Sequence, residues 1–155
     1  MNIPSVEFIQ AMLAPGLMIS ACGLLLLGMN NKYSVVVARI RNLDQEVRGY
    51  RKISMGNKLS DFDTERMGNI ILQNEKLIYR VKLIRNAVIF YSLAVAFFVT
   101  SSLLISYQLI TGREIFSIIL VCFLTGMLSV LAGAFFTVFE MIRAYSIILI
   151  EVESK

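Results

Sequence analysis

Three long uncharged apolar stretches dominate the pattern of this sequence. They run over residues 8–29, 87–110 and 115–139. A bilayer core about 30 Å thick needs about 20 residues of helix to cross it, so each stretch is long enough for a transmembrane helix. Because only the residues from Thr111 to Glu114 separate the second stretch from the third, these two spans are expected to form a tight antiparallel hairpin.

The segment between the first two spans, residues 30–86, has the apolar period of two helices. Apolar residues recur every three or four positions over residues 31–52 and again over residues 64–86. Residues 53–63 between them are rich in Gly, Asn, Ser and Asp, which is typical of a turn. We therefore expect a helical hairpin whose two arms continue directly into the membrane spans.

The third apolar stretch is expected to belong to a helix that is longer than the membrane is thick. A helix from Ile115 to Glu151 would have 37 residues, which corresponds to about 55 Å. Its end, the tail formed by residues 140–155, must then project from the bilayer. The pattern as a whole predicts an all-α membrane protein with a single domain over residues 1–155, three transmembrane helices, a helical hairpin and a projecting third helix.

Composition agrees with lipid as the main solvent of this chain. Apolar residues make up 57% and charged residues 17%, against about 45–50% and about 25% in soluble domains. The chain has no His and two Cys, which excludes His-based acid–base catalysis and a Cys/His zinc cluster. We therefore expect no enzyme activity, no cofactor and no metal site.

The charge distribution predicts the orientation. Residues 30–86 carry twelve Lys and Arg and six Asp and Glu, a net charge of 12 − 6 = +6, whereas the connection between the second and third spans has one positive residue. Positive residues concentrate on the cytoplasmic side of membrane proteins. The N-terminus is thus expected outside, with the hairpin and C-terminus in the cytoplasm. Orientation and anionic lipid explain the charge without a nucleic-acid partner.

Small and polar residues form a stripe along the third span that ends in a carboxylate. One interpretation is a stripe that lines a pore or binds ions, and the other is a close-packing surface between helices. Arg143, three residues after the carboxylate, offers it a local ion-pair partner. The stripe consists of Cys122, Thr125, Ser129, Gly133, Thr137 and Glu140.

Residues 14–32 carry a family resemblance. They read Ala-Pro-Gly-Leu-Met-Ile-Ser-Ala-Cys-Gly-Leu-Leu-Leu-Leu-Gly-Met-Asn-Asn-Lys, and residues 39–43 read Arg-Ile-Arg-Asn-Leu. Both segments resemble the bacterial DUF2721 family, a family of unknown function. The resemblance implies a multi-pass protein of the bacterial inner (plasma) membrane.

A second resemblance concerns topology alone. An external N-terminus, a large inner segment and a tight outer hairpin look like the TolQ/ExbB/MotA class of ion-driven motor subunits. That resemblance implies a ring with a pore, to which Thr125, Thr137 and Glu140 would contribute. The second span lacks a Gly-Thr motif like that of the class.

Two functional hypotheses follow. The first is a homo-oligomeric ion-conducting or motor-like assembly that passes an inorganic cation along the third-span stripe. The alternative is a structural or regulatory membrane protein that docks a cytoplasmic partner or anionic lipid through its basic hairpin. The direction in which Glu140 points distinguishes them, because a pore requires it to face a shared axis.

Overall fold

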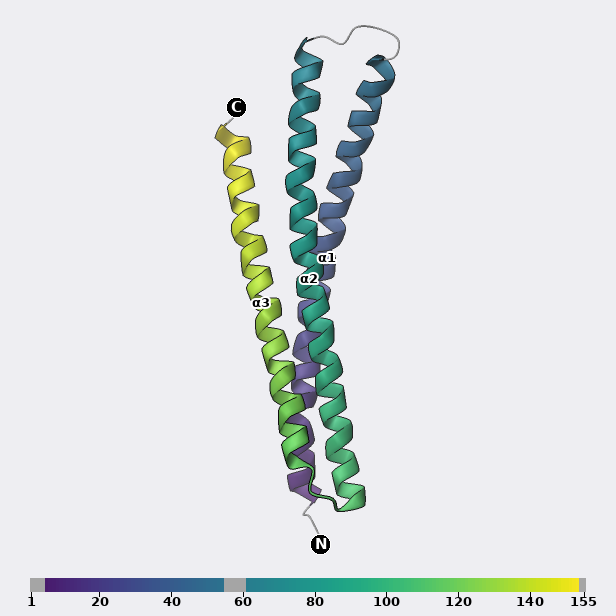
Figure 1. Cartoon of the computed structure of the whole chain (residues 1–155), viewed down its shortest axis with the longest axis vertical. Helices are drawn as coiled ribbons and strands as arrows, with labels where there is room; N and C mark the ends of the chain where they lie inside the picture. Colours follow the sequence, from purple (N-terminus) through teal and green to yellow (C-terminus); the bar gives the residue numbers. More distant parts are fainter. Residues whose placement is uncertain (1–4, 55–60, 154–155) are drawn as a thin grey trace. The chain divides into compact units, whose positions relative to one another are not determined.

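The computed structural model consists of three long helices (Figure 1). They are α1 (Ser5–Ser54), α2 (Asp61–Thr111) and α3 (Phe116–Glu153). The structure describes the backbone of residues 5–54 and 61–153, and the side chains of residues 9–10, 12–50 and 66–144. All regular structure in these ranges is helical, which confirms the all-α prediction.

Each helix is long and apolar enough to cross a membrane. This confirms three candidate spans, and each lies within a longer helix: α1 and α2 have 50 and 51 residues, and α3 has 38. Both arms of the expected hairpin are helical up to Ser54 and from Asp61 onward. The rest of the expected turn, residues 55–60, lies outside the described residues. The cytoplasmic position of residues 30–86 stays a prediction.

The chain divides into two compact units, each built from all three helices. The apolar unit comprises residues 1–30 and 86–136, and the charged unit comprises residues 31–85 and 137–155. Fourteen of the fifteen Lys and Arg belong to the charged unit. A single domain over residues 1–155 stays a prediction.

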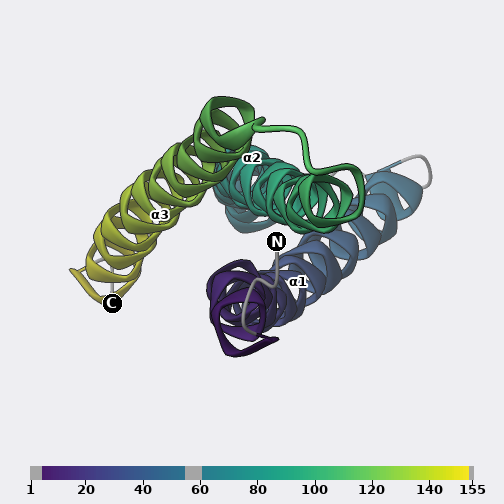
Figure 2. The same cartoon turned by 90° about the horizontal axis from the view of Figure 1, so that it is seen from below.

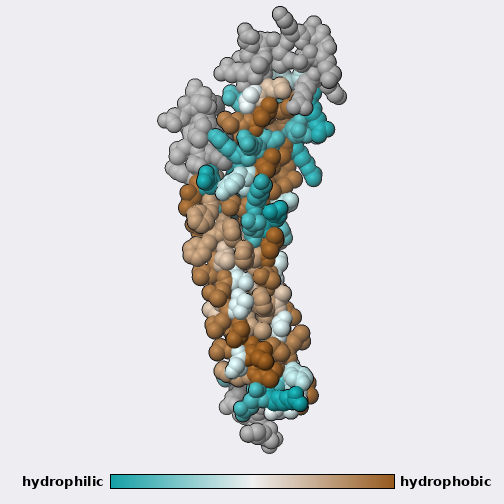
Figure 3. Space-filling model, in the orientation of Figure 1, coloured by the Kyte–Doolittle hydropathy of each residue, from teal (hydrophilic) through white to brown (hydrophobic). Residues whose placement is uncertain are grey.

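The core of the apolar unit is small, and most of the unit's apolar surface faces outward. Cys22, Ala94 and Phe98 are buried, and half-buried apolar side chains pack against them. In contrast, Leu24 and Ile110 are 73% and 86% exposed. Figure 3 shows the apolar side chains that cover the visible face of this unit. Such a surface is unfavourable in water and favourable in hydrocarbon, so the unit suits a lipid environment.

Helices α2 and α3 pack through pairs of an aromatic ring and a glycine. A Cβ built on Gly126 would lie 2.8 Å from Phe98 Cε1, and one built on Gly133 would lie 2.8 Å from Tyr91 Cε1. The two glycines are seven residues apart on α3, and the two rings are seven apart on α2. The pairs therefore repeat every two turns of an antiparallel arrangement, with the small residues leaving room for the rings.

The connection between α2 and α3, visible from below in Figure 2, is formed by residues 112–115. Gly112 has φ of 67°, and its N–H donates to the carbonyl of Gln108 at 2.9 Å. This is the left-handed cap that commonly ends a helix. Sequence placed the start of the connection at Thr111, but Thr111 is helical and its hydroxyl donates to the carbonyl of Tyr107 at 2.9 Å.

Two glycine-to-alanine changes are expected to act in opposite directions. Gly112→Ala forces a side chain into the left-handed region and should lower the free energy of unfolding by about 1–2 kcal/mol. Gly68→Ala, at an exposed position inside α2 with open space around it, should raise it by about 0.5–1 kcal/mol. Thermal unfolding in one detergent measures both changes. Equal shifts of the same sign would contradict the left-handed cap.

Candidate functional site

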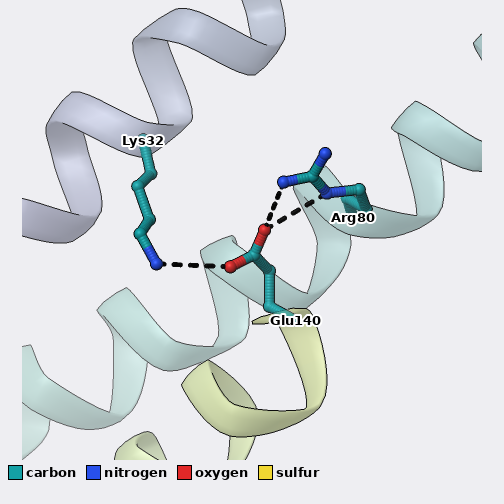
Figure 4. Close-up of polar contacts among 3 residues, drawn as sticks. All are labelled: Lys32, Arg80 and Glu140. Atoms are coloured by element: carbon teal, nitrogen blue, oxygen red, sulfur yellow. Dashed lines mark hydrogen bonds and ion pairs between the residues drawn. The ribbon is translucent and has the colours of Figure 1, made fainter. Parts of the chain in front are cut away.

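The most buried charged side chain among the described residues is Glu140, which contacts two cations from other helices (Figure 4). Its Oε1 accepts hydrogen bonds from Arg80 Nη2 at 2.7 Å and Nε at 3.2 Å. Its Oε2 accepts one from Lys32 Nζ at 3.5 Å. Lys32 lies on α1, Arg80 on α2 and Glu140 on α3. We call these three residues the Glu140 cluster.

A seven-residue repeat explains why a carboxylate is buried on α3. Gly126, Gly133 and Glu140 are seven apart, and all three are buried. Positions seven residues apart recur on one side of a helix after two turns. Glu140 therefore takes the position that the two glycines hold earlier in the helix, but with a long charged side chain.

The two cations also lie beside buried apolar positions of their helices. On α2, Leu77 and Ile84 are buried, and Arg80 falls between them at three and four residues. On α1, Val36 is buried, and Lys32 precedes it by four residues. Residues three or four apart share a helix face. Helix periodicity thus directs both cations toward the interior of the charged unit.

The two ion pairs of Glu140 differ in strength. The side chains of Glu140, Arg80 and Lys32 are 2%, 20% and 41% exposed. Arg80 is the stronger partner, because its contacts are shorter and it is better shielded from water. The Lys32 contact is longer and more solvated, which weakens it. Two cations and one carboxylate leave the cluster with a net charge of +1.

This arrangement is suited to linking helices rather than to binding an external cation. An ionised carboxylate buried without partners is costly, whereas three charge-assisted hydrogen bonds satisfy Glu140 within its own chain. Removing one partner of a buried ion pair typically costs about 3–5 kcal/mol. The cluster therefore couples α1, α2 and α3 inside the charged unit.

The structure divides the predicted stripe between the two units. Cys122, Thr125, Ser129 and Gly133 belong to the apolar unit, and Thr137 and Glu140 to the charged unit. Cys122, Thr125 and Thr137 are half-buried, whereas Ser129, Gly133 and Glu140 are buried.

Two stripe hydroxyls form hydrogen bonds with their own helix. Thr125 donates to the carbonyl of Val121 at 2.7 Å, and Ser129 to that of Thr125 at 3.0 Å. Such bonds satisfy a hydroxyl in an apolar helix without a second copy or an ion. Whether the stripe lines a pore stays a prediction.

Sequence reasoning missed the partners of Glu140. It pointed to Arg143, three residues further on, but the guanidinium of Arg143 lies 5.5 Å from the centroid of the Tyr79 ring. The partners are instead Lys32 and Arg80. One signal was available in the sequence, namely the seven-residue spacing of Gly126, Gly133 and Glu140, which marks the carboxylate as a buried position.

Comparison with known proteins places the chain in a family. A family model described as "Protein of unknown function (DUF2721)" matches residues 12–150. The chain belongs to this family. Membership confirms the resemblance of residues 14–32 and extends it over most of the chain, the Glu140 cluster included. No curated protein and no solved structure matches this DUF2721 member, so the topological likeness to the TolQ/ExbB/MotA class has no support.

Proposed function

We propose that this DUF2721 protein is a structural or regulatory membrane protein that docks onto anionic lipid through its charged unit. The observation that carries the proposal is the unit's excess of cations. Its described side chains include four acids and ten cations. The cations are Lys32, Arg39, Arg41, Arg48, Arg66, Lys76, Arg80, Lys82, Arg85 and Arg143.

Ion pairs within the unit engage three of the four acids. Asp44 contacts Arg48 at 2.8 Å, and Glu46 contacts Arg66 at 2.9 Å. Glu140 is held in its cluster, which leaves Glu75 outside these pairs. Little negative charge therefore remains on the described part of the unit to compensate Arg41, Lys76, Lys82 and Arg85, and an external anion is favoured.

Anionic lipid is the ligand class that best fits this excess. A cation near an anionic membrane surface gains about 1 kcal/mol, and Lys and Arg next to membrane spans lie within reach of headgroup phosphates. A cytoplasmic protein with an acidic face is the competing ligand. Lipid is favoured because the cations begin just after the first apolar stretch, at Lys32, and continue to Arg85, just before the second. Both stretches are suited to a bilayer.

Retention of lipid during purification tests the proposal. The full-length protein, extracted in mild detergent from an equimolar mixture of phosphatidylglycerol and phosphatidylcholine, should retain the anionic lipid in native mass spectra. Raising the salt to about 1 M, which shortens the Debye length to about 3 Å, should remove most of that preference. Equal retention of both lipids at low salt would contradict the proposal.

A homo-oligomeric ion-conducting or motor-like assembly is the second candidate. The observation in its favour is the row of hydroxyls on α3, with Thr125 and Thr137 half-buried. Against it, the Glu140 carboxylate is buried and paired with cations of the same chain. Under the docking proposal, wild-type protein in liposomes should pass no cations at either polarity of applied potential. A cation flux that falls in Thr125→Val, a change of similar shape, would support the assembly instead.

The docking proposal also requires the predicted orientation. Single Cys replacements at Lys58 and Gly112, in a variant without Cys22 and Cys122, report it through an impermeant thiol reagent applied to intact cells. We expect labelling at position 112 and protection at position 58, because positive residues stay on the cytoplasmic side. Labelling at position 58 alone would reverse the topology and place the charged unit outside.

A further inference from the structure

Lys82 and Arg85 are exposed cations one turn apart on α2. Residues separated by three positions share a helix face. Neither side chain forms an ion pair within the part of the chain that the structure describes, whereas Arg48, Arg66 and Arg80 all contact carboxylates. Among the described side chains, no carboxylate compensates either charge, which suits the pair to an anion from outside the chain.

The surroundings of this pair on α2 contain little negative charge. The nearest acid along the helix is Glu75, seven residues before Lys82, which corresponds to about 10 Å of helix rise. Over that distance a solvent-exposed carboxylate is largely screened at physiological salt. The acids of α2 would therefore oppose an anion at Lys82 and Arg85 only weakly, and the nearby carboxylate of Glu140 on α3 is already paired with Arg80 and Lys32.

The pair also lies at the depth at which headgroups are expected. The uncharged stretch of α2 begins at Ala87, two residues after Arg85, and the helix is continuous from Asp61 to Thr111. Arg85 and Lys82 therefore precede the apolar stretch by about 3 Å and about 8 Å of helix rise. Their flexible stems let the charged groups reach the phosphate level.

We infer that Lys82 and Arg85 together bind the phosphate of an anionic lipid headgroup. The guanidinium presents a planar fork that matches two phosphate oxygens, and the ammonium adds a point charge to the same group. This site rests on the proposed function and makes it specific, because it assigns the lipid preference to two residues rather than to the general charge of the unit. Phosphate free in solution is the other source of the same chemistry.

A matched pair of double variants tests the site. Lys82→Gln/Arg85→Gln removes the two cations, and Arg41→Gln/Lys76→Gln removes one Arg and one Lys further from the apolar stretches. Arg41 and Lys76 likewise form no ion pair within the described residues. The protein is placed in nanodiscs of phosphatidylcholine and titrated with phosphatidylglycerol. We expect the affinity for phosphatidylglycerol to be about 25-fold lower in the first variant than in the wild type, since each cation contributes about fivefold. The control should change by less than about threefold.

The outcomes separate this site from the general proposal. If the wild type shows no preference for phosphatidylglycerol, both the site and the docking function are wrong. If it does and both double variants lose affinity equally, the docking function stands and the site is wrong. If inorganic phosphate binds the wild-type protein in nanodiscs as tightly as phosphatidylglycerol does, the site binds free phosphate and the inference of a lipid headgroup is wrong. Both double variants should melt at the wild-type temperature, which confirms that they fold.

Discussion

Replacing Arg80 by Met is expected to lower the free energy of unfolding by about 3 kcal/mol, near the lower end of the range for breaking buried ion pairs. Glu140 would remain 2% exposed with Lys32 as its partner, at 3.5 Å. That contact is long and its lysine is 41% exposed, so it compensates the buried carboxylate only in part. Thermal unfolding of the purified protein in a fixed detergent measures the loss.

Two further variants identify the cause of that loss. Lys32→Met should cost less than about 1 kcal/mol, since a solvated pair contributes little. Arg80→Met combined with Glu140→Leu should recover much of the stability of the single Arg80 variant, because no uncompensated charge stays buried. Equal losses for Arg80→Met and Lys32→Met, or no recovery in the double variant, would contradict the assigned strengths in the cluster.

Replacing Gly133 by Leu is expected to cost about 3 kcal/mol or more, because overpacking of a close contact forces rings and backbone apart. Even a Cβ at this position would lie 2.8 Å from the Tyr91 ring. The matched control is Gly28→Leu, a helical glycine of the same apolar unit with open space around it. That change should leave stability equal or slightly higher, because Leu favours the helix more than Gly does.

The same variant separates packing within one chain from packing between copies. If Gly133 contacts Tyr91 of its own chain, Gly133→Leu lowers the melting temperature at every protein concentration. If Gly133 instead mediates contact between copies, the variant should lose self-association in lipid nanodiscs while the monomer melts as before. Matching losses in Gly133→Leu and Gly28→Leu would contradict the aromatic–glycine contact itself.

The secondary structure of this protein was predictable because its determinants are local. Long uncharged stretches and an apolar period of three to four residues predicted helices for both the spans and the arms of the hairpin. In the structure, α1 and α2 each contain one span and one arm, and α3 contains the third span. In hydrocarbon, a helix is the one isolated segment that satisfies all of its own backbone polar groups. The family was also predictable from a short segment, because residues 14–32 carry the resemblance that the match over residues 12–150 confirms.

The candidate site was predictable only in part. Glu140 was singled out from sequence as the carboxylate at the end of a small-residue stripe, and Gly133 as a position of close contact. The glycine does lie against another helix, where Tyr91 is its neighbour. The ion-pair partner of Glu140, however, was expected on its own helix, whereas its two partners lie on α1 and α2.

The helices, their apolar character and the excess of cations follow from local sequence, because each depends on residues close together in the chain. Which cations contact Glu140 depends instead on how the three helices pack. Arg80 and Lys32 are 60 and 108 residues away along the sequence, and their contact depends on the register with which three helices pack. Fifteen Lys and Arg were candidates for one carboxylate, and local patterns favoured Arg143, whose guanidinium lies over Tyr79. Glu140 lies at the buried position seven residues after Gly133 on α3, and there it contacts Arg80 and Lys32.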